Sequence, residues 1–325
     1  MQNLKMMYTS HYAPDLVIKN DDLAQIMDTS DEWITQRTGI KQRHISLKEN
    51  TSLLATRVAK QLLEKSGWDV ESLDIIVVAT MSPDAYTPAT GAIVQGNIGA
   101  TNAIAFDISA ACSGYIYALS IVESMMKNLN FKRGLIIGSE NLSKILDWKD
   151  RSTAVLFGDG AGGTLVELSD QEDSKILSSD LKTIGSKSEY LTAGETKTLE
   201  TFPTNVPHNF KAFQMEGREV YSFATREVPK SILRAVKAAK IDLEEVDYFL
   251  LHQANARIIK QVAKKLKLDE DKFPINIDEY GNTSAASEPI LFDELVQSGR
   301  IKRGMTIAIS GFGGGLTVGT HIIRY

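Results

Sequence analysis

The chain has 325 residues, of which 43% are hydrophobic and 24% are charged, and its formal net charge is −5. This composition supports one large hydrophobic core or two medium ones and argues against extensive disorder. The negative charge and the lack of a basic arm disfavour nucleic-acid binding. No apolar run reaches the roughly 18 residues of a membrane span, and the N-terminus lacks the regions of a secretory signal. We therefore expect a cytoplasmic protein with no nucleic-acid or membrane partner.

The chain contains a single cysteine, Cys112, which excludes an internal disulfide. Its five histidines are scattered and lack the spacing of metal ligands: His11, His44, His208, His252 and His321. We therefore expect neither a metal nor another cofactor.

Strand-like and helix-like segments alternate along the chain, which predicts an α/β fold. In the first half, the pattern predicts strands at 73–79, 103–107 and 133–138 and helices at 88–99 and 115–126. In the second half, it predicts helices at 219–239, 256–266 and 284–297 and strands at 246–251 and 305–309.

A faint internal repeat suggests that the chain arose by duplication. Residues 157–166 close the first half much as residues 311–320 close the second, each with a glycine-rich run before apolar residues. The stretch 169–213 between the halves is polar and weakly periodic, so we interpret it as irregular surface structure rather than a flexible tether. The predicted domains are an N-terminal half, 1–170, and a C-terminal half, 171–325.

Cys112 lies where a β-like run meets the first turn of a helix with an apolar stripe. A helix start offers free N–H donors and the positive end of the helix dipole, and both stabilise a thiolate and lower the pKa of the thiol. This position predicts a reactive thiol. The alternative is that Cys112 is a small buried hydrophobic residue, since free cysteines are often buried.

His252 and Asn282 each follow an apolar strand-like or turn segment and precede a helix with small residues. Open α/β sheets gather their ligands at such places. A nucleophilic cysteine commonly needs an imidazole, and an asparagine amide can donate to a developing oxyanion or enolate. Taken alone, His252 is equally well a hydrogen-bonded histidine at a strand end, and Asn282 a turn or helix-cap residue.

Basic residues recur every three or four positions along the helix-like stretch 254–267, beside an apolar stripe. Such a face fits a polyanionic partner, although an ordinary solvated helix face has the same pattern. The basic residues are Arg257, Lys260, Lys264 and Lys267.

Five segments together resemble the condensing enzymes of the thiolase-like superfamily, and within it the 3-oxoacyl-[acyl-carrier-protein] synthase III family. They are residues 31–40, 151–162, 252–255, 280–284 and 310–317, and the resemblance extends over essentially the whole chain. It implies an α/β, five-layered αβαβα sandwich built from two duplicated halves. Cys112 would come from the first half, and His252 and Asn282 from the second.

The resemblance also implies the chemistry. Cys112 would take an acyl group from acyl-CoA, with the backbone N–H groups of Cys112 and Gly314 as the oxyanion hole. Malonyl-acyl carrier protein would then lose CO₂, and the enolate would attack the acyl-cysteine while His252 and Asn282 donate to it. This reaction starts type II fatty-acid synthesis and gives 3-oxoacyl-acyl carrier protein. We expect His252 to act as the neutral tautomer with hydrogen on Nε2.

The binding residues are likewise carried over from the family. The resemblance assigns Trp33 and Arg151 to an adenine sandwich, Arg37 to a phosphate, Asn255 to pantetheine and Arg257 to the entrance of the site. It assigns Arg257, Lys264 and Lys265 to the carrier protein, and it implies a homodimer. Without the resemblance, Trp33 would be a packing residue and the arginines surface ion pairs.

Four positions depart from the usual pattern of the family, and one of them, Ser222, stands where some relatives carry a lysine that helps to dock the carrier protein. Thr87 stands where relatives often carry a phenylalanine that reaches into the partner's acyl pocket, so we expect Thr87 and Phe312 to border a pocket that accepts chains longer than acetyl. Val318 replaces a frequent tryptophan. Glu288 replaces an apolar residue, and the sequence offers no account of it.

Other functions remain open on the sequence. A related condensing enzyme could serve a secondary pathway or use malonyl-CoA, and a Cys–His thioesterase would hydrolyse the same acyl-enzyme. A binding module without catalysis is disfavoured because the set of Cys112, His252 and Asn282 is complete.

Overall fold

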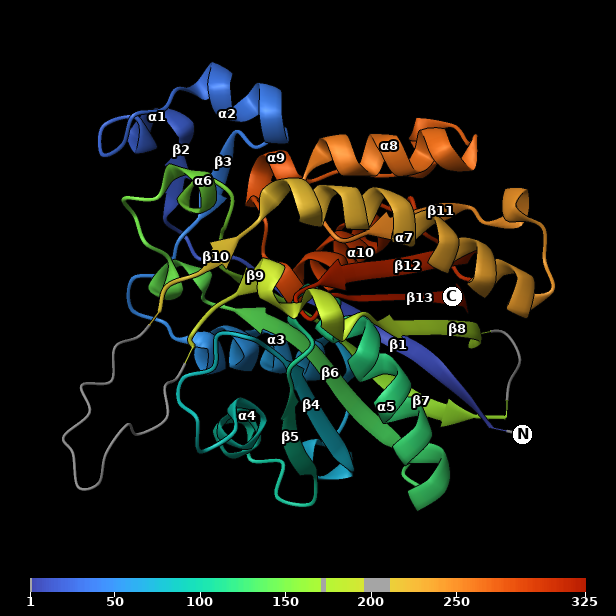
Figure 1. The fold of residues 1–325 in the computed structure, drawn as a ribbon. Helices are drawn as coiled ribbons and strands as arrows, with labels where there is room; N and C mark the ends of the chain where they lie inside the picture. The colour runs from blue at the N-terminus through green and yellow to red at the C-terminus, as the bar shows by residue number, and fades with distance from the viewer. Residues whose placement is uncertain (1, 171–173, 196–210) are drawn as a thin grey trace.

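Two β-sheets with helices between and outside them make up the protein (Figure 1). The structure, a computed structural model, describes residues 2–170, 174–195 and 211–325. Within these ranges, no helix has both the length and the apolar character needed to cross a membrane.

The first sheet has five strands, in which β4 is parallel to both of its neighbours and β7 is antiparallel to both of its own. Its strand order is β1 (Asn3–Tyr12), β7 (Gly160–Ser169), β6 (Arg133–Glu140), β4 (Ile75–Ala79) and β5 (Ile104–Ile108). Every side chain of β4 is buried, as expected for a central parallel strand covered on both faces.

The second sheet repeats this arrangement with four strands. Its order is β11 (Tyr248–Leu251), β12 (Thr306–Gly313), β13 (Thr317–Arg324) and β8 (Lys175–Thr183). The pair β11–β12 is parallel, and β12–β13 and β13–β8 are antiparallel, which matches β4–β6, β6–β7 and β7–β1. The shared order and direction are those that a duplication predicts.

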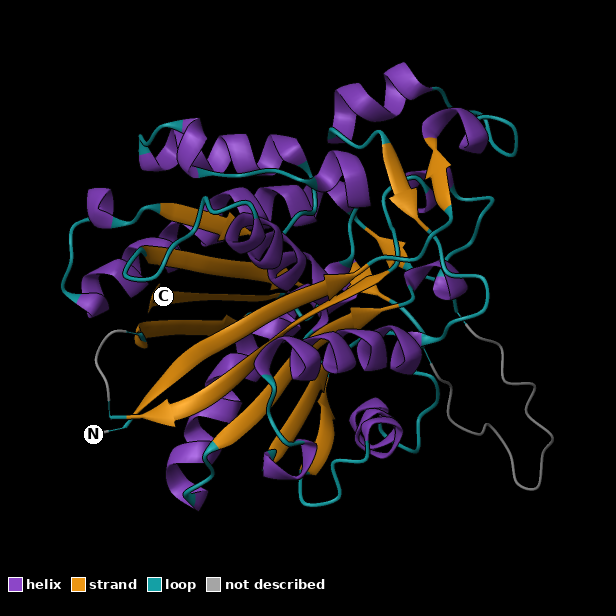
Figure 2. Ribbon diagram, turned by 180° about the vertical axis from the view of Figure 1, so that it is seen from behind, coloured by secondary structure: helices purple, strands orange, loops and turns teal. Residues whose placement is uncertain are grey.

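Helices form the other three layers (Figures 1 and 2). Between the sheets lie α5 (Gly114–Leu129) and α10 (Ser287–Gln297), each of which contacts strands of both sheets. Outside the first sheet lie α3 (Thr51–Ser66) and α4 (Thr90–Ile98), and outside the second lie α7 (Gly217–Ala239) and α8 (Ala256–Leu266). The predicted αβαβα sandwich is confirmed.

Short elements surround this framework. They are β2 (Val17–Lys19), α1 (Asn20–Leu23), α2 (Asp31–Thr38), β3 (Gln42–His44), α6 (Arg151–Ala154), β9 (Leu191–Thr192), β10 (Gln214–Met215) and α9 (Ile277–Tyr280). Several helices begin at the capping residues that their sequences offer: the side chain of Ser30 accepts from the N–H of Trp33 in α2, and that of Asn50 accepts from Thr51 in α3.

One prediction about the connecting stretch 169–213 is wrong. Its described part contains β8, which pairs with β13 as the edge strand of the second sheet. The side chains of β8 are only partly buried or exposed, so the strand carries a mixture of apolar and charged residues. Because no regular alternation results, the sequence pattern of an edge strand is weak. The rest of the stretch includes residues 171–173 and 196–210, which lie outside the described residues.

The two halves meet at positions where one backbone lies directly against the other. A Cβ added to Gly138 in β6 would collide with the carbonyl oxygen of Ala285, in the 3₁₀ turn Ser284–Ala286 before α10. Glycine is therefore required at residue 138 because no side chain fits between the halves.

We expect Gly138→Ala to lower the free energy of unfolding by about 1–3 kcal/mol, the usual effect of overpacking a buried site. Gly96→Ala is the matched control, because a Cβ at Gly96 in α4 meets no atom within 4 Å. Alanine is favoured over glycine inside a helix, so this control should be stabilising by up to about 1 kcal/mol. Chemical denaturation followed by circular dichroism measures both, and equal midpoints for the two variants would contradict the close contact.

Candidate active site

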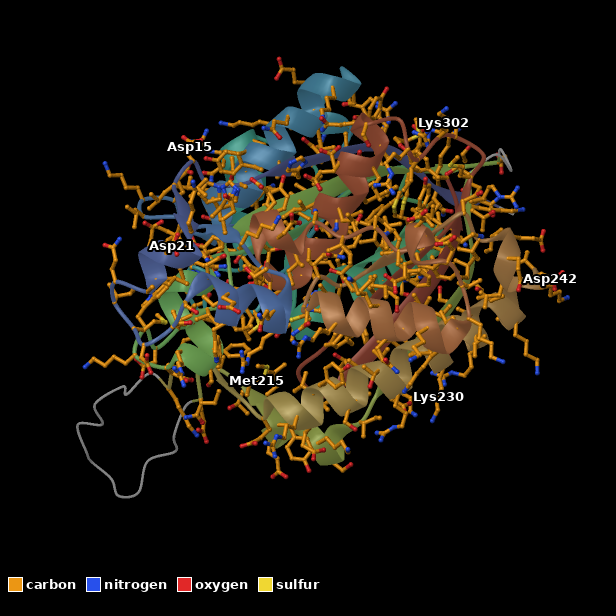
Figure 3. All side chains as sticks on the ribbon, turned by 90° about the horizontal axis from the view of Figure 1, so that it is seen from above. Asp15, Asp21, Met215, Lys230, Asp242 and Lys302 are labelled. Atoms are coloured by element: carbon orange, nitrogen blue, oxygen red, sulfur yellow. The ribbon has the colours of Figure 1, made fainter. Side chains whose placement is uncertain are left out.

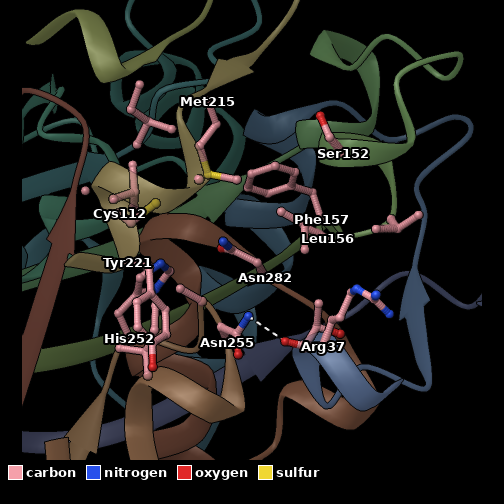
Figure 4. A pocket seen from close by; sticks show the side chains of 18 of the residues that line it. Arg37, Cys112, Ser152, Leu156, Phe157, Met215, Tyr221, His252, Asn255 and Asn282 are labelled. Carbon is pink, nitrogen blue, oxygen red and sulfur yellow. Dashed lines mark hydrogen bonds between the residues drawn. The ribbon is translucent and has the colours of Figure 1, made fainter. Parts of the chain in front are cut away.

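One pocket between the halves brings together Cys112, His252 and Asn282 (Figure 4). Cys112 comes from the 3₁₀ turn Ala111–Ser113 that precedes α5, His252 follows β11, and Asn282 lies between α9 and α10. The three residues predicted from separate segments thus face the same cavity.

A strained turn presents Cys112 to the pocket. The preceding residue, Ala111, has φ 46°, a left-handed conformation that costs a residue with a side chain about 1–2 kcal/mol. Gly313 packs against the cysteine so closely that an added Cβ would lie 2.6 Å from Cys112 N. The backbone around the sulfur is therefore held from both halves of the chain.

The environment of the thiol differs from the expected one. Burial raises the pKa of Cys112 to about 12, and the nearby carboxyl groups of Glu140 and Glu288 act in the same direction. The predicted lowering of the pKa by the helix start is therefore wrong for the ligand-free site. Loss of water outweighs the helix end, because a buried thiolate is poorly solvated.

His252 is buried and electrically neutral. Its backbone N–H donates to the carbonyl oxygen of Ser310 (2.9 Å), which holds the residue at the end of the second sheet. Its Nδ1 lies 2.7 Å from Ser287 Oγ, and its ring meets Phe312 edge to face at 5.1 Å. Burial lowers the pKa of His252 to about 3, so the imidazole carries no charge at neutral pH.

Asn282 is fixed by both its backbone and its side chain. Its N–H donates to Leu156 (2.8 Å) and its carbonyl oxygen accepts from Gly158 (3.1 Å), which ties it to the first half. Its Oδ1 accepts from the N–H of Ser284 (2.9 Å), a turn contact of the kind the sequence allowed. The Nδ2 donors make no hydrogen bond with any described residue and remain free for a ligand.

Trp33 and Arg37 line the pocket, and the guanidinium groups of Arg37 and Arg151 both lie over the Trp33 ring. The Arg37 guanidinium lies 4.5 Å and that of Arg151 5.2 Å from the centre of the Trp33 ring. Arg151 also donates to the backbone oxygen and carboxylate of Asp28. An aromatic ring needs about 7 Å between two flanking planes, twice the usual carbon contact. The space between Trp33 and Arg151 is therefore narrower than an intervening aromatic ring requires.

Asn255 and Arg257 connect the pocket to α2. Asn255 lines the pocket, but its Oδ1 caps α8 by accepting from the N–H of Arg257 (2.8 Å), and its Nδ2 donates to the carbonyl oxygen of Arg37 (3.0 Å; Figure 4). Arg257 is exposed and donates to the carbonyl oxygen of Gln36. Both residues therefore position the pocket wall, a role that sequence reasoning did not assign.

Lys264 and Lys265 lie in the last turn of α8, outside the pocket. Both are exposed, and Lys265 Nζ donates to the carbonyl oxygen of Thr225 (2.8 Å). Positive charge in a last turn also favours the helix by offsetting its dipole. Side chains of the neighbouring α7 project outward as well, Lys230 among them (Figure 3).

The two residues expected to border the acyl pocket, Thr87 and Phe312, lie in different places. Phe312 and Gly313 line the pocket, whereas Thr87 is exposed on the loop before α4 and does not line it. Val318 is buried opposite Phe312 in the register of β12 and β13, behind the pocket wall. Gly314 lies against Ala111, the residue before Cys112.

Sequence reasoning missed most of the apolar wall. It is formed largely by residues that follow β8 or begin α7, and by the segment before β7: Leu156, Phe157, Leu191, Phe213, Met215, Val220 and Tyr221. Several of these residues are single apolar side chains in polar surroundings, so periodicity gave no signal. Along the described parts of the chain, no group of three His, Cys, Asp or Glu side chains is arranged to hold a metal.

Family comparisons match both halves of the chain. A model described as 3-Oxoacyl-[acyl-carrier-protein (ACP)] synthase III matches residues 106–185, and a model of its C-terminal part matches residues 236–325. Among solved structures, 3-oxoacyl-[acyl-carrier-protein] synthase III from Aquifex aeolicus has a TM-score of 0.92 and 43% identity, covering 99% of this chain and 100% of that one. The priming β-ketosynthase of the R1128 polyketide pathway has a TM-score of 0.91 and 29% identity, covering 99% and 96%.

Curated relatives extend over the full length. The β-ketoacyl-[acyl-carrier-protein] synthase III of Lactobacillus helveticus is 55% identical over 324 residues, which are 100% of this chain and 99% of the relative. The protein of the same name from Streptococcus gordonii is 52% identical over 325 residues, 99% of each chain. On this full-length similarity, the chain belongs to the 3-oxoacyl-[acyl-carrier-protein] synthase III family.

Proposed function

We propose that the chain condenses a short acyl-CoA with malonyl-acyl carrier protein by decarboxylative Claisen chemistry, through an acyl-Cys112 intermediate. The chain is an acyltransferase of a family whose name gives the product, a 3-oxoacyl group on the carrier protein. The observation that carries the proposal is the meeting of Cys112, His252 and Asn282 in one pocket.

In the first half-reaction, the sulfur of Cys112 attacks the thioester carbonyl of acyl-CoA. The bond to the coenzyme A sulfur breaks, and the proton lost by Cys112 is balanced by the proton that coenzyme A gains. The backbone N–H groups of Cys112 and Gly314 are proposed to hold the carbonyl oxygen as it becomes negative. The raised pKa of the free thiol means that the proton must leave as the attack proceeds.

In the second half-reaction, the malonyl thioester loses CO₂ and its electron pair forms an enolate. The enolate carbon attacks the acyl-Cys112 carbonyl, the carbon–sulfur bond breaks, and the cysteine regains a proton. Neutral His252 and the free Nδ2 of Asn282 are proposed to donate to the enolate oxygen. Fixed donors in a site without water stabilise such a charge more strongly than water does.

Coenzyme A is proposed to bind at Trp33, Arg37 and Arg151. Indole and guanidinium planes stack on a base, and arginine pairs with phosphate. Because Arg151 already lies over Trp33, an adenine ring must first displace it. Asn255, which lines the pocket, would contact pantetheine. Arg257 would place a positive charge at the entrance of the pocket.

A homodimer is proposed because β5 leaves an open sheet edge. It is the last strand of the first sheet, and Ile104 on it is 41% exposed. Proteins usually cover such edges. A second copy joined at β5 would cover this edge, and the exposed loop with Thr87 would then be free to reach the partner's acyl pocket, as the resemblance implies. A cytoplasmic location and the absence of a cofactor also remain predictions.

A role in a secondary pathway is the second candidate, favoured by the structural similarity to the priming polyketide ketosynthase. The two roles differ in partner and product rather than in the chemistry of Cys112. Turnover with malonyl-CoA and with malonyl-acyl carrier protein discriminates the partners, and product analysis separates condensation from hydrolysis by a thioesterase.

We expect Cys112→Ser to abolish stable acylation by acyl-CoA, because a hydroxyl has almost no anionic character at neutral pH. The substitution is nearly isosteric, so the fold should remain intact by circular dichroism. Intact-mass spectrometry with a panel of acyl-CoAs measures the acylation and shows which acyl groups the wild type accepts. Near wild-type condensation by this variant would contradict the mechanism.

His252→Ala should separate the two half-reactions. Cys112 should still become acylated, whereas malonyl decarboxylation should fall by about 10²–10³, the usual loss when one such donor is removed. Intact mass follows the first step, and CO₂ release from labelled malonyl-acyl carrier protein follows the second. Loss of acylation with retained decarboxylation would reverse the assignment.

Reversal of Lys264 and Lys265 to glutamate should raise the apparent KM for malonyl-acyl carrier protein, most strongly at low salt. Electrostatic docking acts over a Debye length of about 8–10 Å and weakens as salt rises. Acylation of Cys112 by acyl-CoA should change little. The matched control reverses two exposed lysines elsewhere, Lys60 in α3 and Lys302 before β12. If both double variants changed the KM equally, Lys264 and Lys265 would have no specific role in docking, and α8 would be an ordinary solvated helix.

A further inference from the structure

Glu288 is a fully buried carboxyl group beside the site, and the proposed half-reactions do not use it. It lies in the first turn of α10, and Gly311 of β12 leaves the space that its carboxyl group occupies, because an added Cβ there would collide with Glu288 Oε1. Oε1 has no hydrogen-bond partner among the described residues, and none of the ion pairs formed by described residues includes this carboxyl group. Such a group needs an explanation, since burying an unpaired charge is strongly unfavourable.

Ser287 connects Glu288 to the imidazole of His252. The Ser287 Oγ lies 3.0 Å from Glu288 Oε2 and 2.7 Å from His252 Nδ1, and it accepts a longer hydrogen bond from the N–H of Gln253 (3.3 Å). One hydroxyl therefore contacts the carboxyl group and the imidazole at the same time.

This hydroxyl has one proton to donate, and a proton on Glu288 Oε1 would have no acceptor among the described residues, so two arrangements satisfy these hydrogen bonds. If Glu288 is ionised, Ser287 donates to it, and His252 must donate from Nδ1, which leaves Nε2 without hydrogen. If Glu288 is protonated, it donates to Ser287, which in turn donates to Nδ1, and the hydrogen of His252 lies on Nε2. The charge of Glu288 thus selects the tautomer.

Burial decides between the two arrangements. It raises the pKa of Glu288 well above its ordinary value, and hydrogen bonds with its own backbone N–H and with Ser287 offset only part of that shift. Burial therefore favours the protonated, uncharged form of the carboxyl group. A negative Glu288 would also oppose formation of the Cys112 thiolate, so neutrality favours both half-reactions.

We propose that Glu288 is a buried carboxylic acid that holds His252 in the tautomer with hydrogen on Nε2, through Ser287. This inference rests on the proposed function of His252 as a donor to the enolate, and it makes Glu288 a positioning residue for the decarboxylative step. Above the pKa of Glu288, the hydrogen bonds from Glu288 through Ser287 to His252 reverse their direction. The hydrogen of His252 then lies on Nδ1 instead of Nε2, and decarboxylation is lost. Below that pKa the donor is in place.

Other titratable groups lie close enough to contribute to a pH profile. They are Cys112, on the turn before α5; Glu140, at the end of β6, which acts to raise the pKa of the Cys112 thiol; and Tyr115 in α5, whose pKa is raised by burial and also by Glu288. Burial raises the pKa of Glu140 to about 7, so Glu140 titrates across neutral pH. Variants of Glu288 are therefore required to assign any observed change.

The test combines infrared spectroscopy and ¹⁵N NMR on the full-length protein. We expect a protonated-carboxyl band at neutral pH that disappears in Glu288→Gln but persists in Glu140→Gln. The ¹⁵N spectrum, assigned with His252→Ala, should show His252 with hydrogen on Nε2. Loss of a carboxylate band in Glu288→Gln instead, or a wild-type His252 with hydrogen on Nδ1, would overturn the proposal.

Kinetics tests the positioning role. Glu288→Gln keeps a neutral donor to Ser287 but cannot ionise, so it should lack the loss of decarboxylation that the wild type shows as the pH rises. Ser287→Ala should reduce kcat about tenfold or more by removing a hydrogen bond that orients the imidazole. Acylation of Cys112 should change little in either variant. Equal activity of Ser287→Ala and wild type would refute the link. If the wild type itself failed to decarboxylate malonyl-acyl carrier protein, the proposed function would fail, while the spectra would still report the state of Glu288.

Discussion

The arrangement of the site depends on direct packing of one backbone against another where the two halves meet. Gly138 lies against Ala285, Gly313 lies against Cys112, and neither position has room for a Cβ. Asn282 adds a β-bridge to Phe157. Since Cys112 belongs to one half and His252 and Asn282 to the other, these van der Waals contacts between the backbones fix how the three residues lie relative to one another. Catalysis through oriented donors needs such fixed positions.

Burial also favours the uncharged forms of three groups in and beside the pocket. These are the thiol of Cys112, the neutral imidazole of His252 and the protonated form of Glu288. In the proposed reaction, negative charge develops first on a thioester oxygen and later on an enolate. In a medium of low polarity, donors that are already oriented have a large effect on such transient charge.

The resemblance carried by the sequence motifs predicted the architecture, and it named three residues, Cys112, His252 and Asn282, that the structure brings to one pocket. Strongly periodic segments also carried local signals. The buried run of β4 and the amphipathic α8 are found where predicted. The pKa of Cys112 could not be predicted, since desolvation depends on residues far away in the chain. The edge strand β8 and pocket residues such as Leu191 also gave little signal, because their environment is created by tertiary contacts.

Asn255 illustrates a role that only the structure shows. Its side chain caps α8 and at the same time bonds to the backbone of Arg37, so it couples a helix start to the wall of the pocket. Glu288 is a similar case: the resemblance identified an unusual residue, but only its contact with Ser287 gives it a chemical meaning.

The stack of Arg151 on Trp33 has a consequence for the order of events. A nucleotide that enters between the two side chains must displace an interaction the protein makes with itself, so its apparent affinity falls by the fraction of molecules that are open. A planar group can therefore stack between Trp33 and Arg151 only after the Arg151 guanidinium has moved away from the indole ring.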